Sequence, residues 1–380
     1  LIMSKNIDLI SEIEDKIKTV RTKSLDLSFN ELLDMYKDGE LIINPEYQRL
    51  FRWSESQQSR FIESLLLEMP IPPIFVIEEE EGTYELIDGL QRVSSYIHFR
   101  GEHPDYQGED EDSETPRFLR LDSCDICDSL NGLEYKDLPT TLQIRLKRNF
   151  IRVEVLRKES DARLRYHMFK RLNTGGSKLS DQEVRNCTIR LLSPEFNNFL
   201  IECSQHTSFK KCISMVSKEK IEQKYDQELV LRFFAIKNLQ ERYVHDVGSY
   251  LTECMEYFST GPDNFDYQNE RAIFQSTFDI LSKTLGDEAF SPATPTKKGL
   301  SSKFAIYHYE AMTLCIASHL DKLKRLPKEG LSFLKDILTA VKKDPEFINM
   351  TTGGGKNYAK PLKRRIYFVE KRICDFCNGL

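Results

Sequence analysis

The strongest constraint on the fold of this chain is a change of sequence pattern near residue 157. Before that point, short strand-like runs alternate with short helical ones. After it, nearly every segment repeats apolar residues at the three- and four-residue spacing of a helix. A length of 380 residues accommodates about two domains. The sequence therefore predicts an α+β fold, in which an α/β amino-terminal domain precedes an all-helical carboxy-terminal domain.

Local patterns place the elements within these domains. Residues 1–22 are predicted to form a helical extension, the α/β domain covers residues 23–157, and the helical domain covers residues 158–380. Ser28 and Ser54 each begin a capping box, which predicts a helix start. In the α/β domain, strands are predicted at 72–77, 83–87 and 150–156, with helices at 91–99 and 139–148. In the helical domain, predicted helices cover 160–172, 180–192, 219–239, 243–258, 265–285, 302–320, 328–342 and 358–376.

Composition excludes several classes of protein. There are 54 Lys and Arg residues against 60 Asp and Glu, a net charge of −6, which rules out coating of DNA through bulk charge but leaves room for a local basic groove. No apolar run reaches about 18 residues, so no membrane segment is expected. Nine cysteines, an odd number in a long chain, are typical of a reduced cytoplasmic protein.

Three polar segments are candidates for chemistry. The first, Asn-Pro-Glu-Tyr-Gln-Arg at 44–49, precedes the single tryptophan, Trp53. Gln48 and Arg49 could lie at a pocket rim, where a guanidinium binds phosphate with two parallel hydrogen bonds. The alternative is a simple loop that enters a helix, with Trp53 as a core anchor.

The second segment, Asp-Gly-Leu-Gln-Arg at 88–92, connects a predicted strand to a predicted helix; we call it the 88–92 motif. Gly89 permits close backbone approach, and the first helical turn offers free amides to an anion. Arg92 adds a positive charge, and Asp88 could hold a divalent metal or orient a water molecule. The alternative is an aspartate helix cap followed by a surface arginine.

The third segment, 169–176, ends in Asn173, Thr174, Gly175 and Gly176. It predicts an ordinary helix stop with glycines at its end, or a polar elbow whose Asn173 and Thr174 face the same pocket as the other two segments.

Taken together, these segments resemble the GmrSD restriction-type amino-terminal domain family, a bacterial group related to the ParB and sulfiredoxin fold. The family signature is usually Asp-Gly-Gln-Gln-Arg, whereas this chain has Leu90 at the third position. The likeness extends over nearly the whole chain after the first twenty residues, and the matching stretches are 43–49, 58–66, 70–74, 85–92, 169–176, 226–229, 301–304 and 352–365.

The resemblance implies a ParB/sulfiredoxin-like domain at 23–157 that binds a nucleoside triphosphate with Mg²⁺. Some members of the family hydrolyse the nucleotide, and such proteins commonly serve in defence against phage. Asp88, Gln91 and Arg92 are then the candidate catalytic residues, with Asp88 also the candidate metal ligand. The candidate nucleotide-binding residues are Gln48, Arg49, Gly89, Asn173, Thr174, Gly175 and Lys356. Larger relatives carry an HNH-type nuclease, but the seven histidines here do not have its spacing, so a nuclease or another defence protein is the expected partner.

Other functions remain open. The segment 356–372 is strongly basic, so Lys363, Arg364 and Arg365 could contact DNA in a non-catalytic or nucleotide-gated module; a solvated helix face is the alternative. A scaffold that only binds a partner, with a degenerate pocket, is a further candidate function. The chain could also form a homo-oligomer. Two Cys-x-x-Cys pairs, at 124–127 and 374–377, lie too far apart to predict zinc. Gly-Gly-Gly-Lys at 353–356 lacks the spacing of a phosphate loop.

Overall fold

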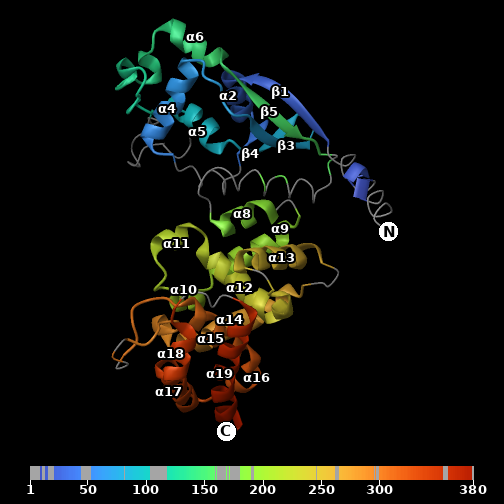
Figure 1. The fold of residues 1–380 in the computed structure, drawn as a ribbon, viewed down its shortest axis with the longest axis vertical. Coiled ribbons are helices and arrows are strands. Elements are labelled where there is room, and N and C mark those ends of the chain that lie inside the picture. Colours follow the sequence, from blue (N-terminus) through green and yellow to red (C-terminus); the bar gives the residue numbers. More distant parts are fainter. Residues whose placement is uncertain are drawn as a thin grey trace. The chain divides into compact units, whose positions relative to one another are not determined.

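The computed structural model describes residues 9–10, 13–15, 21–43, 53–80, 82–102, 118–158, 160, 168, 171, 180–189, 192–244, 246–261, 265–294, 296, 299–353 and 358–378. The chain divides into two compact units, Leu1–Ser177 and Lys178–Leu380. The first contains a mixed sheet and the second consists mainly of helices (Figure 1). The predicted α+β class is therefore confirmed. In the described part of the chain, no helix is long and apolar enough to cross a membrane.

The first unit contains a five-stranded sheet with the strand order β1-β5-β3-β4-β2. Its strands are β1 (Thr22–Ser28), β2 (Leu41–Ile42), β3 (Ile74–Glu80), β4 (Thr83–Asp88) and β5 (Phe150–Leu156). The pairs β1–β5 and β3–β4 are antiparallel, whereas β3–β5 and β2–β4 are parallel. The predicted strands correspond to β3, β4 and β5. The two edge strands, β1 and β2, were not predicted, because β2 has two residues and β1 has only two alternating apolar positions.

Among the described residues, four α-helices accompany this sheet: α2 (Phe29–Lys37), α4 (Glu55–Leu66), α5 (Leu90–Phe99) and α6 (Thr140–Arg148). Ser54 forms the complete predicted capping box with Gln57, whereas at Ser28 only half of the predicted box is present, since its hydroxyl accepts the Glu31 N–H at 3.1 Å. The caps fix where α2 and α4 begin.

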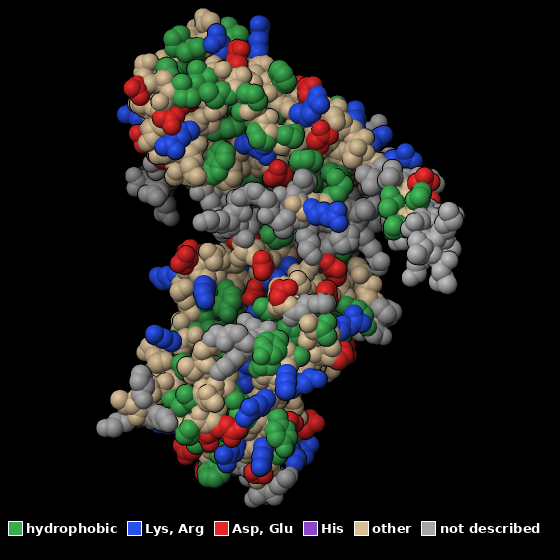
Figure 2. All heavy atoms as spheres, viewed as in Figure 1, with side chains coloured by type: hydrophobic (Ala, Val, Ile, Leu, Met, Phe, Trp, Pro, Cys, Tyr) green, Lys and Arg blue, Asp and Glu red, His purple; other side chains and the backbone are tan. Residues whose placement is uncertain are grey.

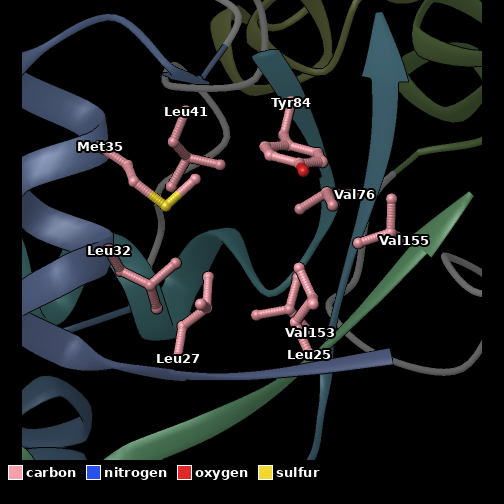
Figure 3. A pocket seen from close by; sticks show the side chains of 9 residues that line it. All are labelled: Leu25, Leu27, Leu32, Met35, Leu41, Val76, Tyr84, Val153 and Val155. Atoms are coloured by element: carbon pink, nitrogen blue, oxygen red, sulfur yellow. The ribbon is translucent and has the colours of Figure 1, made fainter. Parts of the chain in front are cut away.

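One face of the sheet packs against α2 around a small apolar cavity of about 10 Å³ (Figure 3). All five strands and α2 contribute to its lining: Leu25, Leu27, Leu32, Met35, Leu41, Val76, Tyr84, Val153 and Val155. In the close-up these side chains point toward one another from the strands and the helix. The space is about that of one water molecule and its walls are apolar, so it belongs to the packed core and is no ligand site.

The second unit is built around two helices that are buried along most of their length, α12 (Tyr225–Leu239) and α15 (Ile306–Ser318). A helix that is apolar on nearly all sides must lie inside a bundle. Around them the structure places α8 (Asp181–Ile189), α9 (Pro194–Ser204), α10 (Thr207–Cys212), α11 (Lys218–Glu222), α13 (Val247–Thr260), α14 (Tyr267–Thr284), α16 (Leu320–Leu323), α17 (Lys328–Lys343), α18 (Pro345–Thr351) and α19 (Ala359–Asn378).

The helix predicted at 219–239 is divided in the structure. α11 ends at Glu222 and α12 begins at Tyr225, because Lys224 adopts a left-handed conformation with φ of +62°. Short helices α9, α10, α16 and α18 were not predicted, since four to eleven residues give too little periodicity to recognise. Most of the predicted helix 160–172, and much of the predicted extension 1–22, lie outside the described residues.

Candidate functional site

The 88–92 motif forms the connection between β4 and α5. Strand β4 ends at Asp88 and α5 begins at Leu90, so Gly89 makes the turn alone. Gly89 has φ of +102°, and a β-carbon there would lie 2.3 Å from Cγ2 of Ile74. A left-handed backbone and a close approach to β3 both require glycine. The turn therefore holds the start of α5 directly against the sheet.

Asp88 and Arg92 form an ion pair across this turn. Nη2 of Arg92 lies 3.0 Å from Oδ2 of Asp88, and Nη1 donates to the carbonyl oxygen of Pro72 at 2.8 Å. The Arg92 side chain is 13% exposed and the Asp88 side chain is 32% exposed. Burial lowers the pKa of Arg92, and the charge of Asp88 counteracts this effect. An arginine stays protonated under such conditions, so the motif presents a fixed, oriented positive charge.

Gln91 connects the motif to Trp53. Its Oε1 atom accepts the backbone N–H of Trp53 at 3.0 Å, and the backbone carbonyl of Trp53 accepts from Nε2 of Gln58 at 2.8 Å. Oε1 of Gln58 lies 2.7 Å from Nδ1 of the buried His98, and the Trp53 ring packs on Phe61 with 5.7 Å between ring centroids. Trp53 is thus a packed anchor. Gln91 positions the backbone at Trp53, four residues after the end of the 44–49 segment.

The start of α5 has the chemistry of an anion site. Within the described part of the chain, no side chain caps the first amides of α5. Such amides and the positive end of the helix dipole attract an anion, and a guanidinium adds hydrogen bonds and charge. Arg92 supplies that guanidinium, and Asp88 places a carboxylate beside it. Three of the predicted residues, Asp88, Gly89 and Arg92, are therefore assembled at one turn.

Six predicted nucleotide-binding residues lie outside the described residues, and their predictions stay predictions. They are Gln48, Arg49, Asn173, Thr174, Gly175 and Lys356.

The three basic residues that were predicted to face nucleic acid lie on α19 in different environments. Lys363 is exposed, and Arg364 is exposed with its Nη2 atom 3.2 Å from Oε1 of Glu346. Arg365 is only 1% exposed and donates from Nη2 to Oε2 of Glu310 at 2.7 Å. The prediction of a nucleic-acid contact is corrected for Arg365, because its charge lies inside the helical unit and is already paired.

Acidic residues of α18 neutralise part of the remaining basic surface. Besides the Arg364 pair, Arg372 lies 3.4 Å from Asp344. On the visible face of the second unit, basic and acidic side chains are interspersed (Figure 2). The local positive field is weaker than the sequence of α19 alone suggests.

Arg365 is the last member of a chain of ion pairs inside the helical unit that the sequence analysis did not predict. Glu310 also accepts from Arg232 at 2.9 Å, and Glu228 lies 3.3 Å from Arg232 and 2.7 Å from Arg185. Burial in an apolar interior is acceptable for charges only when each is paired in this way. The spacing of Leu362, Arg365 and Val369 could have shown that Arg365 shares the apolar stripe of α19.

The first Cys-x-x-Cys pair lies in a loop folded around Glu63, a residue that was not singled out. Oε1 of Glu63 accepts the backbone N–H of Ile126 at 3.0 Å and of Cys127 at 2.7 Å, and Oε2 accepts that of Asp125 at 3.3 Å. Burial raises the pKa of Cys124 to about 11. Among the described residues, no three His, Cys, Asp or Glu side chains form a cluster that could hold a metal ion.

An open pocket of about 420 Å³ lies in the helical unit, and sequence reasoning did not find it. Its lining comes from α10 to α12 and the connections between them: Lys210, Ile213, Ser214, Val216, Lys218, Ile221, Glu222 and Asp226. Asp226 is 9% exposed, and burial raises its pKa. Among the described residues, its buried Oδ1 atom has no hydrogen-bond partner.

Comparison with known proteins gives a family match to the region that holds the 88–92 motif. Residues 29–190 match the family model described as the GmrSD restriction endonuclease, N-terminal domain. The match runs from the first residue of α2 to just beyond α8 and includes the whole β4–α5 turn. No curated protein and no solved structure matches the chain. Residues 29–190 are therefore similar to the N-terminal domain of the GmrSD restriction endonuclease.

Proposed function

We propose that this protein binds a nucleoside triphosphate at the 88–92 motif and hydrolyses it with Mg²⁺, as part of a bacterial system that defends against phage DNA. The family is a restriction-type, defence-related one. The observation that supports a nucleotide is the oriented Arg92 guanidinium beside the uncapped start of α5. Backbone amides and a guanidinium together suit the phosphate oxygens of such a ligand.

Arg92 is proposed to hold phosphate. In the described part of the chain, its guanidinium makes one contact to Asp88 and one to Pro72, and these leave N–H donors for a ligand. The fixed plane means that little side-chain entropy is lost when phosphate binds. Arg92 therefore contributes charge and orientation, the two factors that dominate phosphoryl transfer.

Asp88 is the residue that fits a metal ion. Its Oδ2 atom binds Arg92, and within the described residues its Oδ1 atom has no hydrogen bond or ion pair. Mg²⁺ in nucleotide sites takes one or two carboxylates and completes its shell with phosphate oxygens and water. One carboxylate oxygen at the turn fits this set. A bound Mg²⁺ would supply charge stabilisation, while Asp88 would orient it or a water molecule.

The test is binding and hydrolysis of ATP, GTP, CTP and UTP with Mg²⁺, with and without DNA. Arg92→Gln should weaken binding about tenfold or more, because a charged hydrogen-bond donor to phosphate is removed. Asp88→Asn should retain or strengthen binding, because a negative charge is removed beside the phosphate, but it should abolish turnover. Arg92→Gln therefore acts on binding, whereas Asp88→Asn acts on turnover.

A matched control is Arg152→Gln. Arg152 also pairs with an aspartate, Asp26, at 3.1 Å, but this pair is exposed and joins strands β5 and β1 rather than lying at the turn. It should leave binding and turnover unchanged. Binding of no nucleotide by the intact protein, or equal binding by Arg92→Gln and wild type, would overturn the proposal. Binding without turnover would leave a nucleotide-gated switch.

The second candidate, a DNA-binding module without catalysis, rests on the exposed part of α19. Lys363 and Arg364 are exposed, whereas the buried Arg365 is no longer a candidate for this contact. DNA affinity should then fall with salt concentration, and Lys363→Ala should reduce that dependence. Arg365 must not be used in this test, because its loss would act through folding. Salt-independent or absent DNA binding would exclude this candidate.

A further inference from the structure

The helical unit holds a thiol that is paired with an imidazole. Sγ of Cys374 on α19 lies 3.1 Å from Nε2 of His319, the residue between α15 and α16. Both side chains are partly exposed. The two residues lie 55 positions apart in the sequence, so the pairing depends on how α19 packs on α15.

The hydrogen bonds of His319 determine which of its nitrogens can accept a proton. Nδ1 lies 3.0 Å from the backbone carbonyl of Cys315, and a carbonyl only accepts, so Nδ1 carries hydrogen. The backbone N–H of His319 bonds to Ile316 instead, which leaves the Cys315 carbonyl for the ring. In the neutral imidazole, Nε2 is then the acceptor, and its lone pair faces the Cys374 thiol.

This arrangement is that of a nucleophile with its general base. The base lies within hydrogen-bond reach of the thiol, and a third group, the Cys315 carbonyl, orients the base. The thiolate is the reactive form of cysteine, and a base that removes the proton increases its supply.

The other described thiols lack these properties. Burial raises the pKa of Cys203, Cys212 and Cys254 to about 12 and that of Cys124 to about 11, so they stay protonated. Cys315 is fully buried. Cys127 is partly exposed like Cys374, but the group beside its sulfur is the Ser129 hydroxyl at 3.5 Å. Cys127 is therefore a natural internal control.

We propose that Cys374 is a modification site, activated by His319, that reacts with low-molecular-weight disulfides. His319 Nε2 takes the thiol proton, and the Cys374 thiolate attacks one sulfur of the disulfide. A sulfur–sulfur bond forms to Cys374, the original one breaks, and the departing thiolate receives the proton from His319. The products are a mixed disulfide and one free thiol, and an added thiol reverses the step.

The experiment measures mixed-disulfide formation at each cysteine with oxidised glutathione at pH 7, by mass spectrometry of the full chain after digestion. A Cys377→Ser background avoids ambiguity between neighbouring cysteines. In this background Cys374 should react at least about tenfold faster than Cys127. His319→Gln should lower the rate at Cys374 about tenfold or more and leave Cys127 unchanged, because glutamine cannot take the proton.

Two results would overturn the proposal. One is equal reactivity of Cys374 and Cys127 in the Cys377→Ser protein, a comparison that needs no histidine variant. The other is an unchanged Cys374 rate in His319→Gln when the circular dichroism spectrum and the Cys127 rate show that the variant is folded. Dithiothreitol should restore the original mass of the Cys374 peptide if the adduct is a mixed disulfide.

Discussion

The guanidinium of Arg365 lies 2.7 Å from the carboxylate of Glu310, and each of these side chains is 1% exposed. The same carboxylate also pairs with Arg232, so α12, α15 and α19 meet at one buried charge. Removing Arg365 would leave Glu310 with only one of these two arginines, in an interior where water cannot replace the lost contact. The consequence is a stability role for a residue that looks, by sequence, like part of a basic surface.

Arg365→Ala should therefore destabilise the helical unit by about 3–5 kcal/mol, the usual loss when a buried ion pair is broken from one side. The adjacent Arg364→Ala should change stability by less than about 1 kcal/mol, because its pair with Glu346 is exposed. Urea unfolding followed by circular dichroism measures both. Similar losses for the two variants would show that Arg365 is not the buried partner of Glu310.

Gly89→Ala should destabilise the first unit more than Gly132→Ala does. Both glycines have positive φ, so each substitution strains the backbone by roughly 1–2 kcal/mol. An added β-carbon at Gly132 meets nothing within 4 Å, whereas at Gly89 it would lie 2.3 Å from Ile74. The difference between the two losses in thermal or urea unfolding isolates the close approach of α5 to β3. Equal losses would contradict that approach.

Gln91→Leu should alter the fluorescence of Trp53, the only tryptophan in the chain. Leucine fills a similar volume but cannot accept the Trp53 N–H. We expect greater acrylamide quenching of Trp53 and a shift of its emission to longer wavelength. Gln143→Leu is the control, because Gln143 binds the carbonyls of Tyr135 and Leu138 instead. If the two variants gave the same emission spectrum, the proposal that Gln91 positions the backbone at Trp53 would be contradicted.

His308 should make the helical unit sensitive to mild acid. Burial lowers its pKa to about 3, whereas an unfolded histidine titrates near 6.5. As pH falls through 6.5, the unfolded chain takes up a proton that the folded one does not, so stability decreases down to about pH 3. The loss between pH 7 and pH 5 is about 2 kcal/mol from this group alone.

The check is urea unfolding of wild type and His308→Phe at pH 7 and pH 5. Phenylalanine suits the site, because the imidazole packs edge-on against Phe347 with 5.0 Å between centroids. The variant should lose about 2 kcal/mol less than wild type on acidification. The other histidines are present in both proteins, so their contributions cancel in the comparison. Identical acid sensitivity in the two proteins would contradict a neutral, buried His308.

Local features of the fold could be predicted from the sequence. Ser28 and Ser54 are correct caps because a capping box needs only four consecutive residues. The strand, turn and helix around Gly89 were likewise predicted, since the glycine and the apolar runs on either side are neighbours in the chain.

Features that depend on distant residues could not be predicted. β1 is a strand because β5 pairs with it, more than 120 residues later, and its own pattern is too short to show it. Arg365 could be placed on an apolar stripe by its spacing, but nothing near it identifies Glu310 as its partner. For the site, the motif predicted Asp88, Gly89 and Arg92 at one turn, whereas the hydrogen bond from Trp53 to Gln91 depends on tertiary packing.

The pairing of β1 with β5 also constrains how the first unit can be made. Thr22 lies opposite Leu156, and Ser28 lies opposite Phe150. The backbone of β1 therefore cannot form these hydrogen bonds until β5 has been synthesised. β3 likewise obtains its parallel neighbour only when β5 has been synthesised. Loop closure over such separations is slow, and unpaired strand edges favour association between chains. A chain interrupted before residue 150 would therefore leave β1 and one edge of β3 without partners, which favours aggregation until β5 has been synthesised.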